Sequence, residues 1–341
     1  MPLLVAPLGG TVKGFTITSI AMLLFAANAE AGEMLARDTA EMVSQQTDTA
    51  GQPRDVHNSE NTLPTEQQQR SPQSTNGGNK TESPVSTHKV NYFSLDHWPG
   101  NNNAQLKFQI SMKFRVLEPN LYVFKYNIFP AYVAYTQKSL WNIGQQSGPF
   151  EENNYNPEFF LDYPVNAVII GRFILRSIVV SLIEHESNGL AGVESRGWNR
   201  QYVLLRFGLA SKEKLELTNS FLSDKALFYV KLWHAWGYSD EDAYLQSIGS
   251  NDTFLDYMGH GEIGVSVRNF LWGGSLRDHQ LDIRTPIFRD IHKDSYEVEF
   301  RQQLPYMNFA VYLQYWYGYG ETLLRFDQFG HRGFVGLSFS Y

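Results

Sequence analysis

Residues 105–116 read QLKFQISMKFRV, and apolar and polar side chains alternate there without a break. One set of alternate positions is apolar: Leu106, Phe108, Ile110, Met112, Phe114 and Val116. The other set is polar: Gln105, Lys107, Gln109, Ser111, Lys113 and Arg115. Successive side chains of a β-strand point to opposite faces, so this period of two predicts a strand with one apolar and one polar face.

The same alternation recurs at 309–317 and at the end of the chain, where Val335, Leu337, Phe339 and Tyr341 share one face. A last strand that ends in an aromatic residue is typical of bacterial outer-membrane barrels. A soluble β-sandwich is the alternative. We favour the barrel because Tyr and Trp gather near the strand ends, as in the aromatic girdles of a membrane barrel.

Twelve candidate strands can be placed along the chain. They lie near 89–95, 104–116, 127–142, 156–165, 173–189, 197–209, 214–236, 254–267, 273–283, 294–303, 307–318 and 331–341. The number is even, as single-chain bacterial barrels require. The expected fold is therefore all-β, a transmembrane antiparallel up-and-down barrel of about twelve strands.

The composition agrees with a barrel. Charged residues make up only 18% of the chain and aromatic residues 14%, whereas soluble domains carry about 25% charged residues. No stretch after residue 30 offers the roughly 20 consecutive apolar residues of a membrane helix. The net charge of −7 argues against a nucleic-acid partner. The chain has no Cys, which excludes disulfides, a thiol nucleophile and a thiolate metal site.

The N-terminal part divides into two segments before the barrel. Residues 1–29 have the pattern of a signal peptide, with Lys13, an apolar core and a small-residue cleavage site at 27–29. The alternative, a membrane anchor, requires a longer apolar run. Residues 30–88 are polar and of low complexity, which predicts a disordered tether because they bury too little apolar area. The barrel is expected over 89–341.

A candidate catalytic pair lies in the stretch His185-Glu186-Ser187-Asn188-Gly189. A serine nucleophile needs a base within hydrogen-bond reach, and residues i and i+2 of a strand share a face. A hairpin centred on Gly192 would place Asn199 opposite His185 and Gly197 opposite Ser187. Asn199 could then orient the imidazole.

The same parity predicts which side of the barrel carries these residues. Leu175, Val179 and Ile183 would share the face of His185, and that apolar face would contact lipid. The opposite face would line a polar lumen, with Arg176, Glu184, Glu186, Arg200 and Arg206. Polar groups facing lipid are costly and indicate function. The alternative is three polar interface residues with no joint role.

Three blocks resemble bacterial outer-membrane phospholipase A. The first is His185 to Gly189 followed by Ser-Arg-Gly-Trp-Asn-Arg at 195–200. The second is Tyr-Thr-Gln-Lys-Ser-Leu-Trp at 135–141, with Pro-Phe at 149–150 and Asn-Tyr-Asn-Pro at 154–157. The third is Trp-Tyr-Gly-Tyr-Gly-Glu at 316–321. Long blocks in the right order are more specific than a triad alone.

The resemblance implies a role for each matching residue. Ser187 would be the nucleophile, His185 the general base and Asn199 the residue that orients it. The N–H of Gly189 would stabilise the oxyanion together with calcium. The calcium ligands would be Ser195, the carbonyl of Leu190 and, from a partner subunit, Ser147. Solvated loop serines are the alternative for Ser147 and Ser195. Gln137 would lie in the dimer contact.

Four features depart from the family pattern. Glu186 stands where Asp is common, Leu190 replaces a common Arg, the loop at 142–148 is shorter, and the polar insert before residue 89 is unusual. The remaining His residues show no metal-ligand spacing. They are His57, His88, His97, His234, His260, His279, His292 and His331.

The expected function is calcium-dependent hydrolysis of phospholipid and lysophospholipid acyl esters, through an acyl-enzyme, in the bacterial outer membrane. The active form is expected to be a homodimer, because its calcium site draws on two subunits. A non-catalytic outer-membrane pore or structural barrel is the rival hypothesis.

Overall fold

The computed structural model describes 83–96, 104–117, 121–123, 126–128, 130–209, 226–272, 276 and 278–339. The expected signal peptide and residues 30–82 of the expected polar segment lie outside these ranges. So do residues 340–341, the last two of the predicted final strand. No helix within the described ranges is long and apolar enough to cross a membrane.

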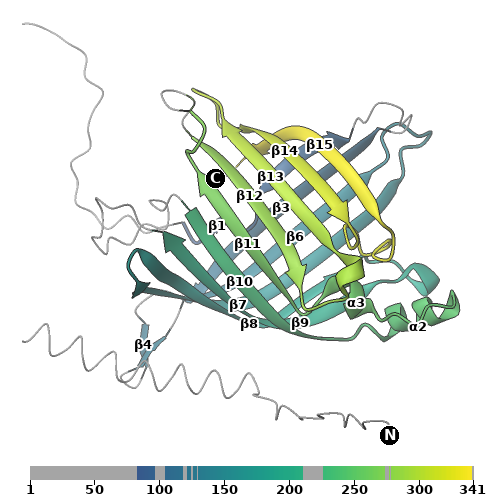
Figure 1. The fold of residues 1–341 in the computed structure, drawn as a ribbon, viewed down its shortest axis with the longest axis horizontal. Coiled ribbons are helices and arrows are strands. Elements are labelled where there is room, and N and C mark those ends of the chain that lie inside the picture. Colours follow the sequence, from purple (N-terminus) through teal and green to yellow (C-terminus); the bar gives the residue numbers. More distant parts are fainter. Residues whose placement is uncertain are drawn as a thin grey trace, which may run out of the picture. The chain divides into compact units, whose positions relative to one another are not determined.

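The described chain folds into a closed antiparallel barrel of twelve strands, as the alternating pattern predicts (Figure 1). The barrel strands are β2 Asn91–Asp96, β3 Gln105–Leu117, β6 Ala131–Trp141, β7 Phe150–Ile170, β8 Phe173–Ser187, β9 Gly197–Leu209, β10 Ala226–Trp236, β11 Gly261–Arg268, β12 His279–Ile287, β13 Ser295–Gln303, β14 Ala310–Gly318 and β15 Gly330–Phe339. Consecutive barrel strands pair with each other, and β2 closes the ring by pairing with β15. A separate hairpin, β4 Leu121–Val123 with β5 Tyr126–Ile128, lies between β3 and β6.

The barrel begins earlier than the predicted boundary at residue 89. An extra strand, β1 Val85–Thr87, pairs with β3, and Thr87 lies opposite Met112. The chain then bulges before β2, and two bulge side chains bind residues of the barrel. His88 Nε2 lies 2.5 Å from Glu158 Oε1, and Lys89 Nζ donates to Asn156 Oδ1 at 2.7 Å. The polar segment predicted to extend to residue 88 is thus wrong for its last residues. These contacts act over long range, and local composition cannot show them.

In strand β14 the alternate residues point to the interior and to the outside of the barrel. Tyr312 and Gln314 are buried in the barrel, while Leu313, Tyr315 and Tyr317 are exposed on its outside. Polar and charged residues also fill the interior, where Arg200 and Lys231 lie 2.9 and 3.0 Å from the Glu184 carboxylate. A polar interior and an apolar exterior suit a barrel surrounded by lipid.

One predicted strand is partly helical. Residues 254–267 were expected to be extended, but Phe254–Met258 forms the short helix α3, and β11 begins only at Gly261. A capping box explains the helix: the Thr253 side chain and the Asp256 side chain each bind the other's backbone N–H. Gly259, with φ 74°, then ends it.

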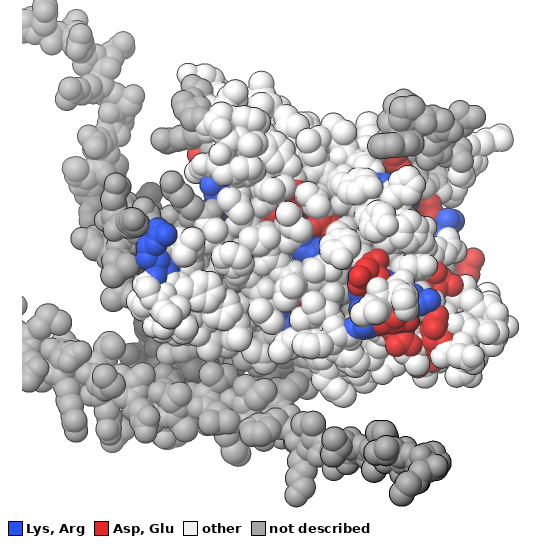
Figure 2. All heavy atoms as spheres, viewed as in Figure 1, with Lys and Arg blue, Asp and Glu red and all other residues white. Residues whose placement is uncertain are grey.

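The loops at one end of the barrel carry the helices. Helix α2, Ser239–Ser247, and α3 both lie between β10 and β11. They pack through an aromatic and aliphatic cluster that includes Leu245, Phe254, Phe326 and Trp198, each at most 1% exposed. In Figure 2 the strand surface is almost uncharged, whereas acidic and basic side chains gather over α2, α3 and the adjoining loops.

Candidate functional site

The hairpin of β8 and β9 brings the candidate catalytic residues together. His185 lies opposite Asn199 and Ser187 opposite Gly197, so the predicted register centred on Gly192 is confirmed. The two strands are joined by a short loop that contains a single 3₁₀ turn, Gly192–Glu194. Three residues separated by up to 14 positions thus meet on one patch of one hairpin.

The imidazole of His185 is bound through one of its two ring nitrogens. Nδ1 lies 2.9 Å from Asn199 Oδ1. An amide oxygen only accepts hydrogen bonds, so Nδ1 carries the proton and Nε2 has the free lone pair. Nε2 is therefore the atom that can take a proton from a hydroxyl, and the nearest hydroxyl on this face of β8 belongs to Ser187.

The amide of Asn199 is oriented from its other side by the next strand. Trp236 is the cross-strand partner of Asn199, and Asn199 Nδ2 faces the Trp236 carbonyl oxygen at 3.5 Å. The following residue, Gly237, has φ 75°, and a Cβ there would lie 2.7 Å from Asn199 Nδ2. Only glycine fits this position without displacing the amide. This support depends on the pairing of β9 with β10, and no local pattern in the sequence indicates it.

The prediction that Val179 shares the outer face with His185 is wrong. Val179 is 1% exposed and packs inside the barrel against Ala134, Phe160 and Tyr202. The pairing of β8 with β9 shifts by one residue between Ser181 and Glu184, and its pairing with β7 shifts at the same level. This bulge reverses the parity. Above it, Ile183 is 46% exposed while Glu184 is fully buried, so His185 and Ser187 do face outward.

Gly189 sits beside Ser187 in a conformation that only glycine adopts easily. Its φ is 68°, and a Cβ on it would lie 2.7 Å from the Tyr155 ring. Tyr155 is the β7 partner of Ser187. A bare backbone at this position can approach a substrate closely, as an oxyanion donor must. Tyr155 lies in the Asn-Tyr-Asn-Pro stretch at 154–157, and the family resemblance implies no role for it.

The loop after Ser187 is organised by Asn188, which is 3% exposed. Its side-chain oxygen accepts the N–H groups of Leu190 and Arg196 at 3.2 and 3.0 Å, and its amide nitrogen donates to the Glu194 carbonyl at 2.7 Å. One buried side chain thus fixes both ends of the loop. The Asn-Gly pair at 188–189 was the signal that could have identified this role.

The residues expected to bind calcium lie on two loops at the same end of the barrel. Leu190 and Ser195 are on the β8–β9 loop, and Ser147 is on the β6–β7 loop, where it is exposed with φ 66°. All three offer neutral oxygens, which suit a hard cation. Within the described ranges no three His, Cys, Asp or Glu residues cluster as a metal site. The oxygen chemistry of these three residues is therefore compatible with a calcium ion.

Gln137 lies on the outer surface in the same lateral row as Ser187. It is the partner of Tyr155, which is the partner of Ser187. Two strand spacings separate Gln137 and Ser187, about 10 Å. Gln137 Nε2 donates to Ser139 Oγ at 3.2 Å, and Ser139 donates to Asn153 at 2.7 Å. The structure thus places the expected dimer residue beside the candidate site.

Glu186, the acidic residue between His185 and Ser187, points to the interior, as parity predicted. Its carboxylate accepts hydrogen bonds from Arg200 Nη2 at 2.9 Å and Trp198 Nε1 at 3.2 Å. The exchange of Asp for Glu at this position therefore does not alter the outer face.

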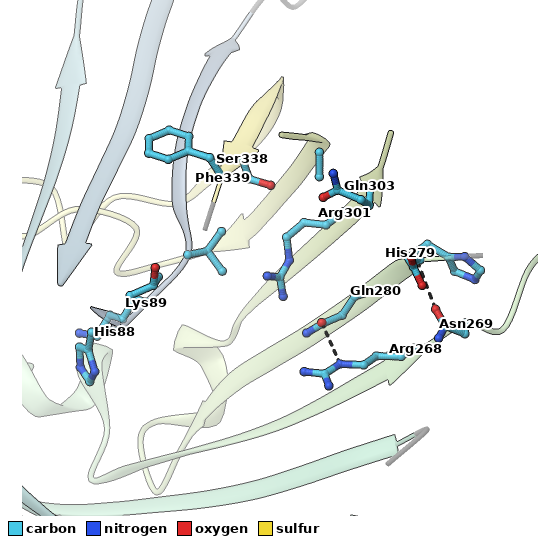
Figure 3. Close-up of a pocket in the computed structure, with 14 residues that line it drawn as sticks. His88, Lys89, Arg268, Asn269, His279, Gln280, Arg301, Gln303, Ser338 and Phe339 are labelled. Carbon is cyan, nitrogen blue, oxygen red and sulfur yellow. Dashed lines mark hydrogen bonds between the residues drawn. The ribbon is translucent and has the colours of Figure 1, made fainter. Parts of the chain in front are cut away.

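A cavity of about 440 Å³ lies at the opposite end of the barrel (Figure 3). Arg268 and Arg301 point into it, but Arg301 is paired with Asp282 at 2.5 Å. Its His279 accepts two backbone N–H groups, from Phe270 and Leu271. This cavity holds none of the predicted catalytic residues. The candidate active site is accordingly the outer face of β8 and β9.

Comparison with known proteins identifies the family. The family model described as Phospholipase A1 matches residues 55–340. Phospholipase A1 of Escherichia coli K12 is 25% identical over 247 residues, which cover 67% of this chain and 68% of that protein. A Neisseria meningitidis protein assigned the same name is 32% identical over 170 residues, covering 48% of this chain but only 38% of that protein.

Solved structures share the fold. The outer membrane phospholipase A of E. coli superposes with a TM-score of 0.58 at 22% identity, over 77% of this chain and 94% of that one. The Salmonella typhi outer membrane phospholipase, a dimer with bound calcium, gives 0.58 at 23% identity over 76% and 94%. The chain belongs to the phospholipase A1 family of outer-membrane β-barrel enzymes.

Proposed function

We propose that this chain hydrolyses acyl esters of phospholipids and lysophospholipids in the outer membrane, with Ser187 as the nucleophile. One observation carries the proposal. The 2.9 Å contact from His185 Nδ1 to Asn199 leaves Nε2 as a base on the strand face of Ser187. This face of β8 points to the outside of the barrel, where the surrounding lipid would be the available substrate.

The reaction follows from these groups. Nε2 of His185 takes the Ser187 proton as Oγ attacks the ester carbonyl, and the N–H of Gly189 donates to the oxyanion. The imidazolium returns the proton to the leaving alcohol, which breaks the ester bond and leaves an acyl-enzyme. Water then gives a proton to His185 as it attacks the acyl carbonyl. The imidazolium returns this proton to Ser187 Oγ as the acyl–Oγ bond breaks, which releases the fatty acid and restores both residues.

We further propose that the reaction depends on calcium and on a homodimer. The Leu190 carbonyl, Ser195 and the partner subunit's Ser147 would hold the ion, which when bound supplies positive charge near the developing oxyanion. One chain would supply two of these neutral donors and its partner the third, which falls short of the 6–8 oxygens that calcium takes, so water would complete the shell. The dimeric, calcium-bound state of the Salmonella relative supports the same arrangement.

Ser187→Ala tests the proposal. We expect it to abolish phospholipid hydrolysis in detergent with calcium, because no other hydroxyl occupies this position beside His185. Ser181→Ala is the matched control: it removes a hydroxyl from the same strand, but from a side chain that is 1% exposed and lies below the bulge. Activity of folded, heat-modifiable Ser187→Ala equal to that of Ser181→Ala would end the serine-hydrolase proposal.

A further inference from the structure

Strand β10 stops two residues short of the end of its neighbour. The last pair of the β9–β10 ladder is Asn199 with Trp236, after which the chain turns away at Gly237. Gly197 and Trp198 therefore extend beyond the ladder on that side. A backbone N–H left without a partner there would destabilise this edge of the hairpin.

Helix α2 supplies the missing acceptor. The N–H of Gly197 donates to Glu241 Oε1 at 2.6 Å. Glu241 is only 1% exposed, and burial raises the pKa of its carboxyl, while the Gly197 N–H opposes this shift. A buried acidic side chain of α2 thus accepts the N–H of the first residue of β9, beyond the end of the β9–β10 ladder.

This contact acts directly behind the nucleophile. Gly197 is the cross-strand partner of Ser187, and a Cβ on Gly197 would lie 3.1 Å from the Ser187 Cβ. The backbone of Gly197 therefore forms a surface against which the Ser187 side chain rests. A displacement of the Gly197 backbone by a few tenths of an ångström would therefore also displace the Ser187 side chain.

Helix α2 holds the neighbouring residue as well. The Arg196 guanidinium stacks over the Tyr244 ring at 4.2 Å and donates to the carbonyls of Val193 and Ser195, both at 2.8 Å. The backbone of Arg196 is in turn bound by Asn188, the residue after Ser187. Leu245 of the same helix is part of the buried cluster with Trp198 and Phe254, so packing holds α2 against the barrel end.

We infer that Glu241 is a positioning residue for acyl transfer, and that it acts through Gly197 to hold Ser187 in line with His185. The inference rests on the proposed function. It assigns a catalytic contribution to α2, a helix without any of the predicted site residues.

The test uses Glu241→Ala and Glu241→Asp in the full-length protein, with Asp240→Asn as the matched control. Asp240 is an exposed acid on the same helix. Aspartate keeps the charge but withdraws the oxygen from Gly197. We measure kcat, KM and the rate at which a fluorophosphonate labels Ser187. Loss of one buried hydrogen bond is expected to lower kcat and the labelling rate about tenfold.

The remaining readouts separate positioning from folding. KM, heat modifiability and the Asp240→Asn rates should stay at the wild-type values, and Glu241→Gln, which keeps an acceptor, should recover most of the labelling rate. Wild-type labelling rates in both Glu241→Asp and Glu241→Ala would overturn the inference. If Glu241→Ala fails to fold, Glu241→Asp decides alone. Labelling or hydrolysis that persists in Ser187→Ala would instead refute the proposed function.

Discussion

Asn199 contacts His185, the proposed general base, on one side and the Trp236 carbonyl on the other. Its neutral amide fixes the tautomer of His185 but offers no full charge to an imidazolium. Its contribution is therefore orientation, which water can partly replace. In the proposed mechanism His185 itself accepts the proton from Ser187.

These roles predict different losses for two substitutions. We expect His185→Ala to lower turnover by about 10²- to 10⁴-fold, the usual contribution of a general base. Asn199→Ala should cost less, about tenfold, because the imidazole keeps its place on β8. Turnover of the two purified, folded variants in detergent with calcium is the measurement. Equal losses would show that Asn199 does more than orient the ring.

At the scale of the element, the β-bulge in β8 and the early end of β10 place the site. The bulge between Ser181 and Glu184 turns His185 and Ser187 outward although Val179, an even number of residues away, points inward. The turn at Gly237 ends β10 beside Asn199 and allows α2 to support the hairpin. Both irregularities serve the same small patch of the outer surface.

Gly237→Ala tests the second of these irregularities. The added methyl group would lie 2.7 Å from Asn199 Nδ2 and should displace the amide from His185, lowering kcat. Gly171→Ala is the matched control, since Gly171 also has positive φ, 55°, but nothing lies within 4 Å of its Cβ position. Both changes carry about 1–2 kcal/mol of backbone strain. Comparable kcat values for the two variants would contradict the steric argument.

At the scale of the molecule, the N-terminal segment and the barrel are expected to be separable. Deletion of residues 30–80 should cost little folding or activity, because their composition cannot support a packed core. A deletion extended to residue 89 should lower the thermal unfolding midpoint, since it also removes β1 and the contacts of His88 and Lys89 with Glu158 and Asn156. Thermal unfolding and activity assays compare the two. Loss of the folded barrel in the shorter deletion would refute the prediction.

Assembly is the second prediction at this scale. A lipase embedded in its own substrate must be inactive by default, and the proposed calcium site shared between subunits would provide that control by mass action. We expect calcium to promote the dimer and activity together, and chelator to abolish both. Sedimentation in detergent alongside the hydrolysis assay measures them. Full activity in a species shown to be monomeric, or in excess chelator, would exclude this mechanism while the serine chemistry remained.

The sequence by itself determined the barrel, its twelve strands and the pairing of His185 with Asn199. Side-chain alternation and a short symmetric hairpin are properties of the local sequence. The folded chain keeps the alternation because each strand has one face toward the barrel interior. The hairpin register followed from Gly192 because both strand segments next to the loop are regular.

Only the tertiary structure decided the parity of β8 below Ser181, the start of the barrel at β1, the helical form of 254–258 and the support of the site by Trp236, Gly237 and Glu241. Each depends on contacts between strands or loops that are distant in the chain. The residues at the β8 bulge are ordinary strand residues, so the sequence does not indicate the bulge. Glu241 lies on an acidic helix and would be predicted to be exposed to solvent, and it is buried because the helix packs against β9. The local sequence pattern does not indicate such contacts. They stabilise the structure only after the barrel has closed and the distant segments have met.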